Sequence, residues 1–78
     1  MNILFVWYSE GATEAEKLAW ERFSHSESIK DAEFLAVETR EQVKTEDERL
    51  TKEGWTFQGL GSGSLARISS YAKSEVNH

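Results

Sequence analysis

The apolar side chains of this sequence fall into short continuous runs, separated by stripes with helical spacing. Residues 2–8 read Asn-Ile-Leu-Phe-Val-Trp-Tyr and are almost entirely aliphatic or aromatic. A run of this composition that is too short for a buried helix predicts a strand covered on both faces, at the centre of a sheet. Residues 32–37 form a second such run, and residues 55–58 alternate as a half-buried strand does. These patterns predict three strands.

Helical signals lie between the first two of these strands. Thr13 and Glu16 form a capping-box pattern, which predicts a helix over 14–24. The expected buried stripe of this helix consists of Ala15, Leu18, Ala19 and Phe23, with Trp20 on its flank. The polar residues 25–30 predict a loop. A strand, a helix and a second strand in this order predict a right-handed crossover between parallel strands.

Residues 38–53 allow two interpretations. Val43 and Leu50 are the only apolar side chains in this stretch, and capping-box patterns begin at both Thr39 and Thr45. One interpretation is a single exposed helix over 40–53. The other continues the second strand to Val43 and starts a shorter helix at residue 46. In either case the helix would end at Gly54, which tolerates the left-handed conformation common after a helix C-terminus.

The last third of the chain contains a glycine-rich segment, 59–64, followed by a further helical pattern. One face of the expected last helix would carry Leu65, Ile68, Ala72 and Val76, with Ser62 or Ser64 as the N-cap. The sequence therefore predicts one α/β domain over residues 1–78, with the element order β-α-β-α-β-α. Its sheet would have three strands, with residues 2–8 central and the helices packed against it.

The amino-acid composition restricts both the cellular compartment that we expect and the chemistry that the side chains can perform. The chain has no cysteine, which excludes disulfides, thiol nucleophiles and thiolate metal sites. A short chain without disulfides favours a reducing compartment, so we expect a cytoplasmic protein. The longest apolar run is too short for a signal peptide or a membrane span. We expect no metal and no cofactor, because His25 is the only histidine apart from the last residue.

Charge is distributed unevenly along the chain. The formal net charge is −5, and residues 10–53 carry 13 acidic and 7 basic side chains. Binding to a nucleic-acid backbone requires clustered Lys and Arg, and none are clustered here. We therefore expect no direct nucleic-acid binding and no association with anionic membranes. An acidic surface that attracts a basic protein fits this distribution better.

Two groups of residues are candidate sites. An acidic protein-binding surface would comprise Glu38, Glu41, Glu46, Asp47, Glu48 and Trp20. An alternative anion site at the start of the expected last helix would comprise Gly59, Gly61, Gly63, Ser64 and Arg67. Neither group resembles a catalytic constellation, because desolvated carboxylates and nucleophile–base pairs are missing from the pattern. We expect no catalytic residues.

These observations favour a non-catalytic protein-binding module. It would be a small acidic inhibitor or modulator, of the kind that phages and mobile elements carry. Its partner would be a larger protein with a basic surface, such as one that handles nucleic acid. Two alternatives stay open. One is an anion- or nucleotide-binding domain, and the other is a homo-oligomeric structural protein such as a homodimer, because a three-stranded sheet leaves two edges unpaired.

Overall fold

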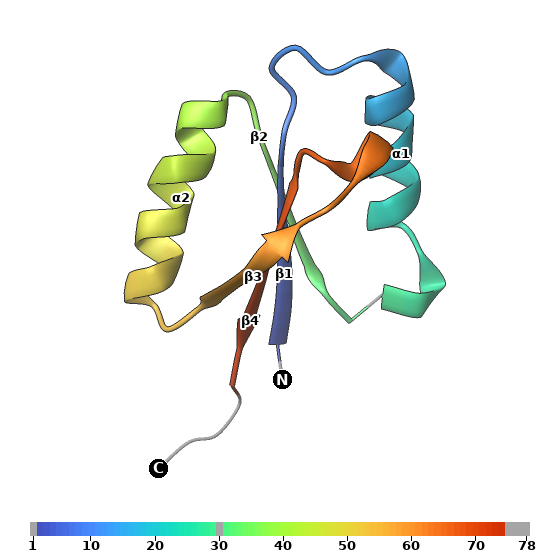
Figure 1. Ribbon diagram of the computed structural model, residues 1–78. Coiled ribbons are helices and arrows are strands. Elements are labelled where there is room, and N and C mark those ends of the chain that lie inside the picture. The colour runs from blue at the N-terminus through green and yellow to red at the C-terminus, as the bar shows by residue number, and fades with distance from the viewer. Residues whose placement is uncertain (1, 30, 75–78) are drawn as a thin grey trace.

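A four-stranded mixed sheet lies between two helices in the computed structural model, which describes residues 2–29 and 31–74 (Figure 1). The strands are β1 (Asn2–Tyr8), β2 (Glu33–Val37), β3 (Thr56–Leu60) and β4 (Ile68–Lys73). The helices are α1 (Glu14–Ser24) and α2 (Arg40–Lys52), with the short 3-10 helices η1 (Glu27–Ile29) and η2 (Gly63–Leu65). The prediction of a small α/β domain is confirmed.

β1 is an interior strand, as its apolar run predicts. The strand order is β2-β1-β4-β3. β2 pairs with β1 in parallel and places Leu35 opposite Val6, whereas β4 pairs with β1 antiparallel and places Tyr71 opposite Leu4. Successive side chains of a strand point to opposite faces of the sheet. β1 therefore supplies apolar side chains to both faces, which explains why its sequence does not alternate.

α2 covers one face of the sheet and forms the best-buried core. The buried residues of this core are Leu4, Val6, Leu50, Trp55 and Tyr71. Leu50 is the only fully buried residue of α2, and 2% of its surface is exposed. Burying a leucine side chain stabilises the fold by about 1.5–3 kcal/mol relative to its exposure. Leu50 is therefore the central contact of α2 with the sheet, and the partly buried Val43 packs against the same core.

α1 covers the opposite face of the sheet (Figure 1). It packs there through aromatic contacts. The Trp20 ring stacks on Trp7, with 5.5 Å between ring centroids and an angle of 4° between ring planes. The edge of Phe23 meets Phe5 at 4.7 Å, and Phe5 in turn stacks on Phe34 at 5.6 Å. Aromatic pairs of this kind contribute about 0.5–1.5 kcal/mol beyond the area that they bury. This aromatic cluster is a second core on the far side of the sheet.

α1 has the predicted bounds and the predicted cap, but its buried stripe is rotated. Thr13 Oγ1 accepts a hydrogen bond from the backbone N–H of Glu16, and Glu16 Oε1 accepts one from the backbone N–H of Thr13. Leu18 was expected on the buried stripe and is 47% exposed. Phe23 packs on the sheet as predicted. Trp20, predicted on the flank, also points to the sheet, because its large ring finds partners on β1 and β2.

α2 is one continuous helix, which decides between the two interpretations of this stretch. Thr39 and Gln42 form the capping box at its start. The second capping pattern lies inside the helix, where the Thr45 hydroxyl donates to the carbonyl of Glu41 four residues earlier. Gly54 follows the C-terminus with φ +98°, the left-handed conformation expected there.

The last element differs from the prediction, because residues 68–73 form strand β4 rather than part of a helix. The sheet accordingly has four strands, and the order is β-α-β-α-β-β. Ile68 and Ala72 share one face in either structure, since positions four apart coincide in a strand as well as in a helix. β4 pairs with β1 on one side and with β3 on the other. The predicted contact of Val76 lies outside the described residues.

The glycine-rich segment 59–64 begins in β3 and runs into the loop of a β3–β4 hairpin. The N–H of Gly61 donates to the carbonyl of Ile68 at 3.0 Å and closes this loop. A side chain at Gly61 would collide with the backbone of Leu65, and Gly63 has φ +59°. Glycine is required at these two positions by the shape of the loop, not by the entry into a helix.

Replacing Leu50 by alanine should destabilise the protein by about 2–5 kcal/mol, because the cavity would open in the centre of the α2 core. This is a large part of the roughly 4–12 kcal/mol expected for a chain of this length. Urea unfolding followed by circular dichroism measures the loss. L18A is the matched control, and it should cost less than about 0.5 kcal/mol, since Leu18 is 47% exposed. Equal losses in both variants would contradict the packing described here.

Candidate functional site

The carboxyl ends of β1 and β2 are where an α/β sheet of this topology usually binds a ligand. The two strands are parallel neighbours, and the helices that follow them pack on opposite faces. In this protein the segments that follow β1 and β2 bond to each other and close this end of the sheet. The N–H of Ser9 donates to the carbonyl of Val37 at 3.1 Å, and the N–H of Glu10 donates to the carbonyl of Glu38 at 2.8 Å. These bonds continue the β1–β2 pairing into the loops.

Glu10, in the same loop after β1, also occupies the N-terminus of α2. The Glu10 carboxylate accepts a hydrogen bond from the backbone N–H of Arg40 at 3.3 Å. A helix N-terminus attracts anions because its first N–H groups lack partners and carry partial positive charge. A carboxylate of the chain therefore stands where an anionic ligand would bind.

Arg67 is held in place by internal contacts near this end of β1. Its guanidinium lies 4.6 Å from the centroid of the Tyr8 ring, and its Nη1 donates to the carbonyl of Glu10. Its Nε lies 3.4 Å from Oε2 of Glu16 in α1, and only 15% of the side chain is exposed. The guanidinium therefore already contacts an ion-pair partner, a carbonyl and an aromatic ring. These contacts tie the start of β4 to β1 and α1.

The anion-site hypothesis loses its structural basis. It required the N-terminus of a long helix after the glycine-rich segment, and only the three-residue η2 is found there. Ser64 lies within η2, and the side chain of Ser62, at its N-cap position, forms no capping hydrogen bond. Gly59 lies in β3 at its register shift, Gly61 and Gly63 shape the hairpin loop, and the guanidinium of Arg67 is already paired.

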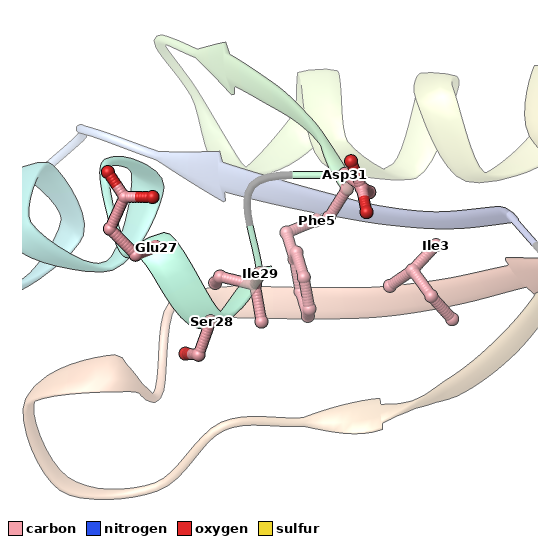
Figure 2. Close-up of a pocket in the computed structure, with 7 residues that line it drawn as sticks. Ile3, Phe5, Glu27, Ser28, Ile29 and Asp31 are labelled. Carbon is pink, nitrogen blue, oxygen red and sulfur yellow. The ribbon is translucent and has the colours of Figure 1, made fainter.

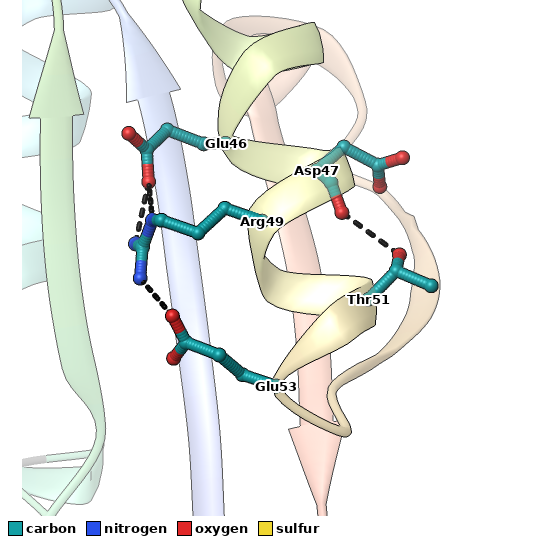
Figure 3. A network of polar contacts seen from close by, with 5 residues as sticks. All are labelled: Glu46, Asp47, Arg49, Thr51 and Glu53. Carbon is teal, nitrogen blue, oxygen red and sulfur yellow. Dashed lines mark hydrogen bonds and ion pairs between the residues drawn. The ribbon is translucent and has the colours of Figure 1, made fainter.

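The acidic residues of α2 are partly neutralised within the helix (Figure 3). Arg49 lies between two of them: its Nε donates to Glu46 at 2.9 Å, and its Nη1 donates to Glu53 at 2.6 Å. These hydrogen bonds raise the pKa of Arg49 above its ordinary value, chiefly through Glu46 and then Glu53. One guanidinium is shared by two carboxylates, so Arg49, Glu46 and Glu53 together keep a single negative charge.

The Asp47 side chain is directed at the sheet, not at the surface where a partner protein would bind. Its Oδ1 accepts a hydrogen bond of 2.7 Å from the hydroxyl of Tyr71, a core residue on β4. Burial, followed by the hydrogen bond and the negative charge of Asp47, raises the pKa of Tyr71 well above its usual value. The neutral phenol is the form that donates this bond, so the contact persists throughout the physiological pH range.

The six residues predicted to form one protein-binding surface do not come together. Trp20 belongs to the aromatic cluster on the α1 side, whereas the acidic residues of α2 lie on the opposite side of the sheet. Glu41 and Glu48 are exposed, but Lys44 and Lys52 are exposed on the same outward side of α2. Glu38, which precedes the N-cap residue of α2, is also exposed.

An apolar edge strand is the surface that the sequence did not reveal. Among the described residues three large apolar side chains are exposed, and two of them lie on β3: Phe57 at 50% and Leu60 at 68%. β3 is an edge of the sheet, with β4 on one side only. The alternating pattern of residues 55–58 did predict a strand there. The predicted three-stranded sheet, with residues 2–8 central, also placed this strand at an edge. It did not predict that β3 pairs with β4 instead of β1, or that Phe57 and Leu60 are exposed there.

No metal site and no membrane span are found in the part of the chain that the structure describes. The described His, Asp and Glu residues include no group of three that could hold a metal ion. His25 Nδ1 lies 2.7 Å from the carbonyl of Glu21, within its own turn. None of the helices in the described ranges is long and apolar enough to cross a membrane.

Comparison with known proteins adds no relative: no protein family, no curated protein and no solved structure matches this chain. Any functional argument therefore depends on the surfaces described above.

Replacing Glu16 by glutamine should make stability less dependent on acid pH. The pKa of Glu16 is lowered, chiefly because its carboxylate accepts the backbone N–H of Thr13, with a further contribution from Arg67. Glutamine can still accept that bond but cannot pair with the guanidinium. A lowered pKa stabilises the fold above the ordinary value of 4.5, and this stabilisation is lost as pH falls through the folded-state pKa.

The expected result is that E16Q is less stable than the native protein at pH 7 and that the difference shrinks below pH 4.5. Thermal unfolding across this pH range measures it. The control is E14Q in the same helical turn, where the native side chain is 94% exposed. A stability difference for E16Q that stays constant with pH would contradict the ion pair with Arg67.

Proposed function

We propose that this protein is a non-catalytic protein-binding module, a small acidic inhibitor or modulator of a larger protein with a basic surface. The observation that supports this proposal is the edge strand β3, which exposes Phe57 and Leu60. Its sequence, Thr-Phe-Gln-Gly-Leu, contains no charged residue and no proline. Soluble proteins usually protect an edge strand with such residues, so their absence favours a strand that accepts a partner.

The backbone of β3 provides the means of attachment. An extended segment of another protein can add to a sheet edge through main-chain hydrogen bonds, while exposed side chains give selectivity. The register shift between Phe57 and Gly59 is a bulge that breaks the regular ladder. A bulge limits uncontrolled pairing between edges but leaves room for a fitted partner.

Phe57 is well supported as an anchor. Its ring meets the edge of the buried Tyr71 ring at 5.6 Å, and the Tyr71 hydroxyl is fixed by Asp47. A ring that is half exposed and already positioned loses little conformational freedom on binding, which is typical of interface hot spots.

Net charge determines the kind of partner. The acidic residues do not form one contact patch, but the chain as a whole carries −5. A net charge of this sign accelerates encounter with a basic protein and disfavours acidic ones. The proposed partner is therefore a larger basic protein, of the class that handles nucleic acid, and this acidic protein would itself make no contact with nucleic acid.

The same edge supports a second candidate, a homodimer in which two β3 strands pair. Like charges oppose this assembly, since each copy would bring −5. Light scattering at high protein concentration separates the two candidates. A dimer that dissociates in the F57A/L60A variant would support the homodimer, and a monomer would remove it.

The test of the proposed function is a pull-down from the native host at low salt, with the F57A/L60A variant beside the native protein. We expect a basic protein to be retained by the native chain and its retention to fall at least about tenfold with the variant, because two anchor side chains are lost. Retention should also fall as salt is raised.

The control is L18A, which removes another exposed large apolar side chain, from α1 on the other side of the molecule. It should retain the partner as the native protein does. Recovery of no partner at low salt and high bait concentration would refute the proposal, as would equal retention by L18A and F57A/L60A.

A further inference from the structure

An open pocket of about 560 Å³ lies on the α1 side of the sheet, at the N-terminal end of β1 (Figure 2). Its lining includes the apolar side chains of Ile3 and Phe5 from β1 and of Ile29 from η1. Figure 2 shows these three side chains directed into the same space. The volume is within the range of pockets that bind small molecules, about 300–1,000 Å³.

The pocket exists because α1 is shorter than the sheet that it covers. α1 ends at Ser24, and the chain then passes through η1 before it enters β2. One part of the Phe5 ring is fixed by Phe23 and Phe34, at centroid distances of 4.7 Å and 5.6 Å. A ring held on these sides offers the pocket a rigid wall, so a ligand would bind without first ordering it.

Two carboxylates lie at the margin of this apolar space. Glu27 and Asp31 line the pocket and are exposed, and neither takes part in a hydrogen bond or ion pair among the described residues. In Figure 2 they stand at its edge, away from the side chains of Ile3 and Ile29. Lys30 lies between them in the sequence and outside the described residues. The charge preference of the pocket is therefore tested below with ligands that differ only in their charged group.

We propose that this pocket binds a small organic cation, an apolar body that carries one ammonium group. The apolar body would pack against Ile3, Phe5 and Ile29, where a polar group would find no partner. The ammonium would remain at the margin near Glu27 and Asp31, where it keeps its water while it is attracted by the carboxylates. No residue of β3 lines the pocket, so this proposal is independent of protein binding at the β3 edge.

The isoleucine methyl groups provide a direct test. The chain has three isoleucines: Ile3 and Ile29 line the pocket, whereas Ile68 is buried in β4 opposite Trp7. With isoleucine methyl groups labelled for NMR, titration with 2-phenylethylammonium should shift Ile3 and Ile29 in a saturable way and leave Ile68 unchanged. A ligand this small should bind in about the millimolar range.

Ligands of equal apolar body test the charge. 2-Phenylethanol should bind about 1.5- to fivefold more weakly than 2-phenylethylammonium, the range expected for an exposed ion pair. 3-Phenylpropionate should bind more weakly still, and the preference should shrink as salt is raised. In the E27Q/D31N variant the affinity for the ammonium compound should fall to that for the alcohol, while the affinity for the alcohol stays unchanged.

Three results would overturn the proposal. The first is the absence of any saturable shift at Ile3 and Ile29 with millimolar 2-phenylethylammonium. The second is a shift at Ile68 as large as at the other two, which would indicate a general effect on the fold. The third is binding of the alcohol or the carboxylate as tight as that of the cation, which would leave an apolar pocket without the proposed charge preference.

Discussion

The burial of β1 on both faces is the constraint on which the rest of this structure depends. Its side chains from Ile3 to Trp7 are all apolar, and successive ones point to opposite sides of the sheet. Each side therefore needs its own cover, and the chain supplies one helix for each. One strand thus organises two small cores: a compact one around Leu50 under α2, and a cluster of stacked rings under α1.

Two helices cannot cover a four-stranded sheet completely in a chain of 78 residues. The cover is incomplete at the bare edge of β3 and at the pocket beyond the C-terminus of α1. Both places expose apolar side chains next to well-packed ones: Phe57 beside Tyr71, and Phe5 beside Phe23. The surfaces proposed for binding are the places where the two helices leave apolar side chains of the sheet uncovered.

Much of the polar chemistry of the chain is used to hold the fold together. Arg67 joins β4 to β1 and α1, Glu10 occupies the start of α2, and Asp47 fixes the buried Tyr71 hydroxyl. Charged groups engaged in this way have few hydrogen-bonding positions left for a ligand. In the proposed function, the remaining charge would act at longer range, by attracting a basic partner rather than by forming a contact patch.

The sequence by itself determined the local elements. The capping boxes at Thr13 and Thr39 and the continuous apolar runs identify both helices and the first two strands, because caps and periodicity involve neighbouring residues. Only the tertiary structure decided that residues 68–73 are a strand, since positions four apart, such as Ile68 and Ala72, share a face in a helix and in a strand alike. The pairing of β3 with β4, the contacts of Arg67 and the pocket beside Phe5 were not predicted. The contacts of Arg67 and the pocket join segments far apart in the chain, which no local pattern encodes, and the pairing of β3 depends on β4 being a strand.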